Sequence, residues 1–578
     1  MATEVTPGHD VREAGEILSV TSTVEQRPQL RSRWRFWIPR LAAAILIPVL
    51  LLALTEGALR LFHVGYSTSL MEPCVVHGQS TSCYNLFFAA PFFPPGIIKT
   101  PQFFSMSPQK PPGTYRIVVL GESAAMGDPD PAYGFSRYLE VMLRQRFPST
   151  KFEVINTSMV AINSHVLRSI AQQLQNYRPD LVIIYAGNNE VVGPYGPGTV
   201  LASSSLNISI IRASIFVRSS RLGQLLTQAG SPRSEWRGME MFLEKQVRAD
   251  APALQHTYEN FSRNLEDVVQ AAHAAGAKVF LSTVATNLKD CPPFSSLHRE
   301  GLSSRALDEW TSLVKRGAAL EDARSFADAL KLYLEAAQID NQYAELEFRI
   351  ARCYWELGDH SSAKKFFLLA QDLDTLRFRA DSRIDQIIRS VAKSSGQKVE
   401  LLDAQSALAS ESHYGVIGSE LLYEHVHLKP QGNYLLARAA FEKIISILPS
   451  ESLGSTSSSE PLGESECERL LALTGHDRSR LAAEMAQRLQ RPPFTTQMNH
   501  SQQIQNLLST ATGFTESFSE TLSEYQWAIA QSPGDPILHY KFGFFLFDFD
   551  RNASAQQFLL ARPVDNFPVF LPDGSLVQ

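Results

Sequence analysis

The stretch Tyr115-Arg-Ile-Val-Val-Leu-Gly-Glu-Ser-Ala-Ala-Met-Gly127 decides the fold of this 578-residue chain. Its apolar first half is typical of a buried strand, and it stops abruptly at Gly121-Glu122-Ser123 before a helical pattern at 135–144. In α/β proteins, chemistry gathers where a strand ends and a helix follows. We therefore predict an exposed Ser123 hydroxyl that becomes a nucleophile if a base can reach it.

Further apolar segments continue the same alternation along the chain. We expect strands at 115–120, 152–156, 180–185, 277–282 and 398–403, and helices near 135–146, 164–177, 250–275 and 431–446. Buried strands that alternate with helices predict an α/β fold with a mostly parallel sheet covered on both faces. The functional loops should then meet at the carboxyl ends of the strands.

Between these β/α segments the sequence turns helical and repeats itself. Ala329, Tyr333 and Ala336 recur 34 residues later as Ala363, Phe367 and Ala370. This spacing places small residues where two antiparallel helices touch, so the segment resembles a pair of tetratricopeptide (TPR) units. An ordinary helical hairpin with alanine at the contact is the simpler alternative. A further unit of this kind is expected near 515–562.

The predicted domain organisation follows from these changes of pattern. An α/β domain is expected in two parts, separated by the helical insert, with a Ser-rich linker and a helical region after it. The expected boundaries are 65–112 for an irregular lead-in, 113–304 and 396–448 for the α/β domain, 305–395 for the insert, 449–466 for the linker and 467–578 for the helical C-terminal region.

The amino-terminal region predicts a membrane anchor. Residues 1–40 are expected to be a disordered cytoplasmic segment, and 41–62 a transmembrane helix built around the uninterrupted apolar run 41–54. Arginines precede that run, so the amino terminus should be cytoplasmic and the rest periplasmic or extracellular. A cleaved signal peptide and a buried core helix are the rival interpretations.

Composition excludes several function classes. The formal net charge of −6 gives no basic field for nucleic acid. The five cysteines show no metal-ligand spacing and no phosphate loop is present, so we expect neither metal nor cofactor. Cys74 and Cys83 can form a disulfide outside the cytoplasm, and free thiols are equally compatible with the sequence.

His427 is the best-placed base for Ser123, because it lies just before a helix in the second part of the α/β domain. Glu424, three residues earlier, can converge on the same side of a turn and hold the imidazole tautomer. His425 is a rival for the role of base. For the oxyanion, Asn188 follows a strand end and a glycine, and the loop 157–164 offers backbone N–H groups.

Four separated blocks together resemble the SGNH (GDSL-like) hydrolase family. They are Gly121–Gly127, Val154–Ser164, Gly187-Asn188-Asn189 and Glu424-x-x-His427. The resemblance implies a flavodoxin-like three-layer sandwich. It also implies Ser123 as nucleophile, His427 as base and Glu424 as the acid, with an oxyanion hole made by the N–H groups of Ser123 and Ala161 and the Asn188 side chain.

The chain departs from the family pattern at four positions. Glu122, Asn189 and Glu424 each stand where aspartate is usual, and Ala161 stands at a glycine. The Ala161 N–H survives the change if its backbone conformation does not require glycine. These departures bear on catalytic efficiency more than on the fold.

The sequence therefore predicts a membrane-anchored, extracytoplasmic serine esterase or acyltransferase. Acylated carbohydrates are the expected substrates, a protein partner is expected at the TPR-like helices, and hydrolysis and transfer remain open. The alternative is a weak or inactive hydrolase fold that serves as a TPR-mediated interaction scaffold.

Overall fold

A computed structural model describes residues 33–76, 78–100, 102–201, 207–228, 235–448, 460–514, 516–562, 564, 571–573 and 575. The chain forms two compact units, one ending at Val64 and one beginning at Gly65. The first contains helix α1 (Arg33–Leu61), which is long and apolar enough to cross a membrane. Residues 33–40 are thus helical rather than disordered, because aromatic and apolar residues already dominate there. Residues 1–32 lie outside the described part.

A five-stranded parallel sheet forms the centre of the second unit. Its strands are β4 (Thr114–Gly121), β5 (Lys151–Asn156), β6 (Leu181–Tyr185), β7 (Lys278–Ser282) and β8 (Val399–Leu402). They lie in the order β5-β4-β6-β7-β8, and every neighbouring pair is parallel. This is the flavodoxin-like order, so the predicted fold class is confirmed.

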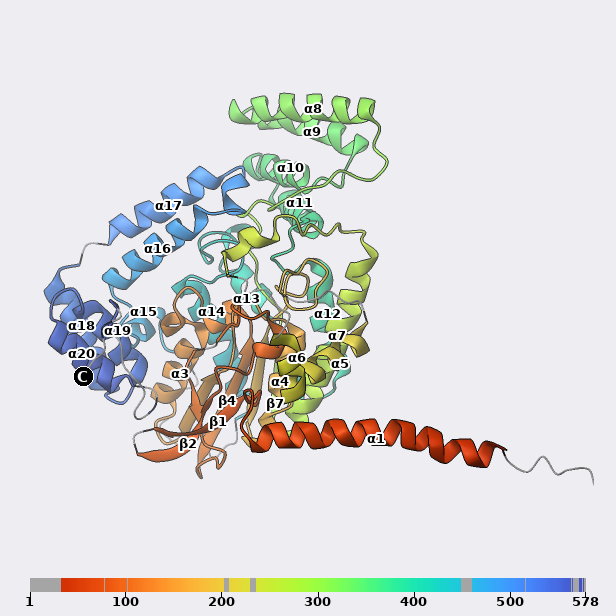
Figure 1. Ribbon diagram of the computed structural model, residues 1–578. Coiled ribbons are helices and arrows are strands. Elements are labelled where there is room, and N and C mark those ends of the chain that lie inside the picture. The colour runs from red at the N-terminus through yellow and green to blue at the C-terminus, as the bar shows by residue number, and fades with distance from the viewer. Residues whose placement is uncertain are drawn as a thin grey trace, which may run out of the picture. The chain divides into compact units, whose positions relative to one another are not determined.

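Helices cover both faces of this sheet (Figure 1). On one face lie α3 (Phe135–Arg146) and α14 (Pro430–Ile445), which pack against each other. On the other lie α4 (Ser164–Ala171), α7 (Pro252–Ala274) and α12 (Ser382–Ser394). The resulting three-layer sandwich leaves the carboxyl ends of the strands as one shared edge.

Helix α12 lies within the range expected for the insert, yet it belongs to the sandwich. Its apolar residues recur at helical spacing, and Ile384 and Ile388 join the main core. It packs on α7 and β8, so it forms the crossover between β7 and β8. The insert therefore ends before Ser382 rather than at 395.

The insert consists of α8 (Ser304–Asp322), α9 (Phe326–Ile339), α10 (Ala344–Glu356) and α11 (His360–Leu373). The repeated residues are the buried ones: Ala329, Tyr333 and Ala336 in α9, and Ala363, Phe367 and Ala370 in α11. A Cβ on Gly317 of α8 would lie 2.5 Å from the Tyr333 ring, so the close approach of α8 and α9 requires glycine there.

The lead-in 65–112, expected to be irregular, contains a small antiparallel sheet. Its strands are β1 (Met71–Val76), β2 (Gln79–Tyr84) and β3 (Ser105–Met106). Cys74 and Cys83, on neighbouring strands, form a disulfide with a Cα–Cα distance of 5.7 Å. The hairpin pairing brings the two cysteines together, which their spacing alone left open.

The described part of the C-terminal region contains six α-helices. They are α15 (Glu464–Leu470), α16 (Gly475–Leu489), α17 (His500–Gly513), α18 (Phe518–Gln531), α19 (Pro536–Leu546) and α20 (Arg551–Leu560). Helix α15 begins inside the expected linker 449–466, of which residues 449–459 lie outside the described part. Helices α18 to α20 occupy the range of the further expected repeat, and that repeat stays a prediction.

Candidate active site

Ser123 is the first residue of the short helix α2 (Ser123–Met126), directly after β4. The turn needs glycine just before it, because a Cβ on Gly121 would lie 2.4 Å from the Tyr185 carbonyl oxygen. Gly127, at φ 98°, ends the helix in the left-handed region. These two constraints place the serine at the carboxyl edge of the sheet, as predicted.

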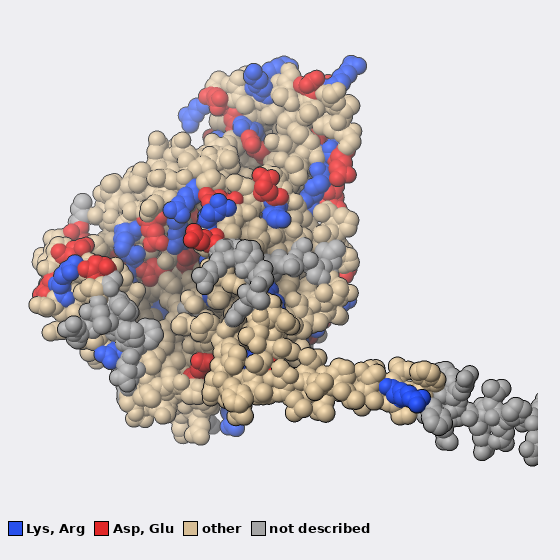
Figure 2. Space-filling model, viewed as in Figure 1, with Lys and Arg blue, Asp and Glu red and all other residues tan. Residues whose placement is uncertain are grey.

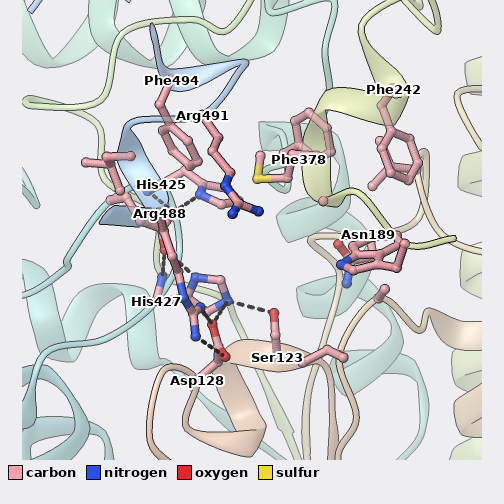
Figure 3. A pocket seen from close by; sticks show the side chains of 18 of the residues that line it. Ser123, Asp128, Asn189, Phe242, Phe378, His425, His427, Arg488, Arg491 and Phe494 are labelled. Atoms are coloured by element: carbon pink, nitrogen blue, oxygen red, sulfur yellow. Dashed lines mark hydrogen bonds and ion pairs between the residues drawn. The ribbon is translucent and has the colours of Figure 1, made fainter. Parts of the chain in front are cut away.

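The structure brings His427 and Glu424 to Ser123. The His427 Nε2 lies 2.8 Å from Ser123 Oγ, although the two residues are 304 positions apart. The other ring nitrogen, Nδ1, contacts Glu424 Oε1, and the same oxygen accepts the His427 backbone N–H at 3.1 Å. Glu424 is only 1% exposed. Figure 3 shows the imidazole directed at the serine. The geometry is that of a nucleophile, a base and an orienting acid.

A tight loop before α14 fixes this histidine. Leu422 and Leu428 form an isolated antiparallel bridge, and the Tyr423 N–H donates to the His427 carbonyl at 2.9 Å. The two residues that carry the acid and the base thus lie between paired backbone segments. Their positions are set by main-chain hydrogen bonds as well as by side-chain packing.

The rival base, His425, lines the same cavity, and its Nδ1 contacts Glu424 Oε2 rather than Ser123. Its ring lies against Phe294, Phe378 and Phe494, with centroids 5.3 to 6.3 Å apart. Burial there holds the pKa of His425 well below its usual range. The ligand atoms of Glu424, His425 and His427 lie within 4.8 Å of one another, close enough to hold a metal ion. A metal bound there would take the nitrogen and oxygen atoms that orient the base.

Asp128 and Arg488 join the site and were missed in the sequence. Asp128 Oδ2 lies 3.4 Å from His427 Nε2, and Arg488 Nη1 of α16 donates to that oxygen at 2.5 Å (Figure 3). Burial lowers the pKa of His427, Asp128 raises it and Arg488 lowers it further. Nothing in the local sequence links two positions 360 residues apart.

The structure corrects the predicted role of Asn188. That side chain is 4% exposed, its Oδ1 accepts the Ala380 N–H at 3.1 Å, and it does not line the cavity. The neighbouring Asn189 does line it (Figure 3). Its Nδ2 donates one hydrogen to the Ile162 carbonyl at 3.1 Å, which leaves the second amide hydrogen for the cavity.

Buried Glu122 fixes the backbone of Asn188 and Asn189, and so decides that the Asn189 side chain is the one that faces the cavity. Its two carboxyl oxygens accept the backbone N–H groups of Asn188 (2.9 Å) and Asn189 (3.2 Å). These bonds fix the turn after β6, and sequence spacing alone could not separate the two neighbours. Burial, with the nearby Glu190 carboxyl, raises the pKa of Glu122 to about 8.

Ala161 lines the same cavity as Ser123, with φ 59°. This left-handed conformation is the one that favours glycine, and alanine costs roughly 1 kcal/mol there. The position therefore has a backbone conformation that favours glycine while carrying a methyl group.

A cavity of about 560 Å³ opens above Ser123. Trp236, Phe242, Phe378 and Phe494 give it aromatic walls, and the exposed Arg491 reaches into it (Figure 3). The C-terminal region contributes one wall, from Glu484 to Phe494. Ser123, Asp128, Ala161 and Asn189 come from the edge of the sheet.

Comparisons with known proteins bear on parts of the chain. Residues 320–380 match a family model described as tetratricopeptide repeat, which confirms the repeat predicted in the insert. No curated protein matches the sequence.

Among solved structures, an acetyl xylan esterase is 11% identical, with 57% of this chain and 99% of that chain covered and a TM-score of 0.27. A GDSL-like lipase from Bacteroides thetaiotaomicron is 11% identical, with 58% and 89% covered and a TM-score of 0.25. Because these TM-scores are low, the function proposed below rests on the geometry of the site alone.

Proposed function

We propose that the chain is a membrane-anchored, extracytoplasmic serine esterase or acyltransferase of the SGNH type. The observation that carries this proposal is the 2.8 Å contact between His427 Nε2 and Ser123 Oγ, with Glu424 on the opposite ring nitrogen. A serine hydroxyl needs such a base to become a nucleophile at neutral pH.

In the proposed reaction, Ser123 Oγ attacks the ester carbonyl and gives its proton to His427 Nε2. Glu424 stabilises the imidazolium, which then protonates the leaving alcohol as the acyl-enzyme forms. The N–H groups of Ser123 and Ala161 and the Asn189 side chain stabilise the tetrahedral oxyanion. Water, or a sugar hydroxyl in a transferase, then attacks the acyl carbonyl and gives its proton to His427. His427 passes that proton to Ser123 Oγ as the bond between this oxygen and the acyl group breaks, which restores the serine and the neutral base.

The cavity walls support a carbohydrate ester as substrate. Four aromatic side chains, Trp236, Phe242, Phe378 and Phe494, line it. Aromatic side chains offer large apolar faces on which the C–H faces of a sugar ring can pack. Arg491 adds a charged donor for sugar hydroxyl or carboxylate groups.

Two features support a location outside the cytoplasm. Arg33, Arg35 and Arg40 lie in the amino-terminal part of α1, before its apolar run, which favours a cytoplasmic amino terminus. The disulfide between Cys74 and Cys83 fits an oxidising compartment for the second unit. The TPR insert is the expected site for a protein partner, and a pull-down that depends on 304–373 would test it.

Turnover of p-nitrophenyl acetate by the full chain in detergent tests the catalytic proposal. Ser123→Ala should abolish it. Asn189→Ala should lower kcat by roughly 100- to 1000-fold, as loss of an oxyanion donor does. Asn188→Ala is the matched control and should keep kcat while losing stability, since the Ala380 N–H loses its acceptor. Equal rates for wild type and Ser123→Ala would favour the scaffold alternative.

A further inference from the structure

Helices α5 (Ile208–Ser219) and α6 (Arg221–Gln228) form a hairpin between β6 and α7 that takes no part in the catalytic site. Ile208, Ile211 and Ile215 recur at helical spacing on its inner face and pack toward the main core or are buried. These contacts hold the hairpin against the main core. They do not account for the side chains on its opposite face.

The outer face of the hairpin is also apolar. Its large exposed side chains, with their exposed fractions, are Ile210 (60%), Phe216 (77%), Val217 (50%), Leu225 (40%) and Leu226 (69%). A helix with apolar side chains on its outer face as well as on its inner face is normally covered on both, by protein or by lipid. Large exposed apolar side chains gathered on one hairpin favour an interaction site.

The hairpin carries no acidic side chain that an anionic membrane surface would repel. Residues 207–228 contain Arg212, Arg218 and Arg221 and no Asp or Glu. In Figure 2, the surface at the position of α5 and α6 in Figure 1 is largely free of charged side chains. Arg212 pairs with Asp267 at 2.7 Å and Arg218 donates to the Phe93 carbonyl at 2.8 Å, so these arginines hold the hairpin to the protein. The outer face that remains is apolar and without acid, which suits the apolar side of a lipid interface.

Only a short stretch of chain links the end of α1 to the residue that binds this hairpin. Tyr66 follows Leu61, the last residue of α1, by five positions, so their Cα atoms are at most about 18 Å apart. Tyr66 is bound to α6, because its N–H donates to Gln224 Oε1 at 2.9 Å and its carbonyl accepts from Gln224 Nε2 at 3.0 Å. Phe87 is half exposed and stacks on Tyr66 with ring centroids 5.1 Å apart, and the neighbouring Leu86 is half exposed as well, so both add to the apolar side chains near the hairpin.

We propose that the α5–α6 hairpin, together with Leu86 and Phe87, lies in the interface of the same bilayer that α1 spans. The occupant of its outer face is lipid. This inference rests on the membrane anchoring proposed above. A second contact beside a single spanning helix restricts the rotation of the catalytic unit about its tether. Residues 236–239 and Phe242, which follow the hairpin in the sequence, line the catalytic cavity.

Nitroxide labels on the full chain, reconstituted into vesicles of equimolar phosphatidylcholine and phosphatidylglycerol, test this proposal. Labels go on Phe216→Cys, on Leu46→Cys in α1 and on Ser509→Cys on the exposed side of α17. The native free cysteines are buried and leave the labelling specific. Collision rates with oxygen, which enters lipid, and with a water-soluble nickel complex are then compared for each label.

We expect the ratio of oxygen to nickel collisions at Phe216 to exceed the ratio at Ser509 severalfold. A ratio equal to that at Ser509 would overturn the inference, and so would a Phe216 label shielded from both reagents, which means a protein partner or a second copy. The Leu46 label reports separately on the anchor, so failure of anchoring is distinguishable from failure of the hairpin contact.

A charge variant gives a second readout. Phe216→Glu with Leu226→Glu should lower the ratio at a label on Ile210→Cys to the value for a water-exposed site, with p-nitrophenyl acetate turnover retained. Leu508→Glu, at an exposed leucine of α17, is the matched control and should change neither quantity. An unchanged ratio in the double variant would also overturn the proposal.

Discussion

Two helical regions are added to the sandwich, the insert and the C-terminal region. They differ in how clearly a sequence pattern predicts them and in what they contribute to the catalytic site. The insert, α8 to α11, carries a 34-residue repeat that a family model also matches. Yet none of the described residues that line the catalytic cavity lies in it. The C-terminal region has a weaker pattern, and its residues from Glu484 to Phe494 form one wall of that cavity.

This difference shows that a sequence repeat predicts packing within helix pairs and does not predict contribution to a catalytic site. A periodic pattern records packing inside a pair of helices, because the same small residues must meet in each copy. A catalytic wall needs only a few contacts at particular places, such as the ion pair between Arg488 and Asp128. Such contacts leave no period in the sequence.

Two phenylalanine truncations should separate these roles most strongly. Phe367→Ala, in the core of the insert, should cost roughly 3–5 kcal/mol of stability and leave KM unchanged. Phe494→Ala, in the cavity wall, should raise KM about tenfold through lost substrate contact. Thermal unfolding and steady-state kinetics measure the two effects. A KM change in Phe367→Ala as large as that in Phe494→Ala would break the comparison.

The edge of the sheet should dominate the pH dependence of stability. Burial raises the pKa of Glu190 to about 7, while hydrogen bonds from Ser164 oppose the shift. A carboxyl whose pKa is raised on folding stabilises the protein below its unfolded pKa, and this contribution is lost as the pH rises through about 7. The contribution of Glu190 to the free energy of unfolding that is lost in this way is at most about 3 kcal/mol.

Glu190→Gln should therefore reduce the fall in the unfolding midpoint between about pH 5 and pH 8. Buried Glu122, with a pKa of about 8, should maintain part of that fall. Glu442→Gln, at an exposed position of α14, is the control. The Glu442→Gln midpoint should fall with pH as the wild-type midpoint does. If the Glu190→Gln midpoint falls just as steeply, the Glu190 carboxyl does not contribute to the pH dependence of stability.

The Asp128–Arg488 pair should set the acidic limb of activity. Burial already lowers the pKa of His427, so the base stays neutral to a lower pH than usual. Arg488→Gln removes a cause that lowers this pKa and should move the acidic limb of kcat/KM to higher pH. Asp128→Asn should move it to lower pH. Arg352→Gln, in the insert, should not move it. Shifts of the same sign in both pair variants would contradict this role.

The smallest expected effect concerns Ala161. Glycine at this left-handed position should relieve roughly 1 kcal/mol of strain in the folded state. Glycine also raises the conformational entropy of the unfolded chain, which offsets part of that gain. Ala161→Gly should thus change stability by less than about 1 kcal/mol and leave kcat within a small factor of wild type. Denaturant unfolding gives the value, and a loss above that size would mean that the methyl group contributes packing.

Much of the fold was predictable because buried strands and repeated helices have periods. The strand before Ser123, the return of the chain to the sheet after the insert, and the approach of Glu424 and His427 to Ser123 all followed from such patterns and from spaced motifs. The sequence places α12 in the insert, because an apolar stripe on a helix does not identify the surface against which the helix packs. Asn189 and the Asp128–Arg488 pair depend on side-chain direction and on contacts across hundreds of residues.

Labelling by a fluorophosphonate probe tests the central claim most directly. The account predicts that the full chain forms one adduct, located on Ser123 by peptide mass spectrometry. The adduct should be absent in Ser123→Ala and form far more slowly in His427→Ala. No adduct on the folded wild type, or one that survives Ser123→Ala, would contradict the claim that Ser123 is a nucleophile activated by His427.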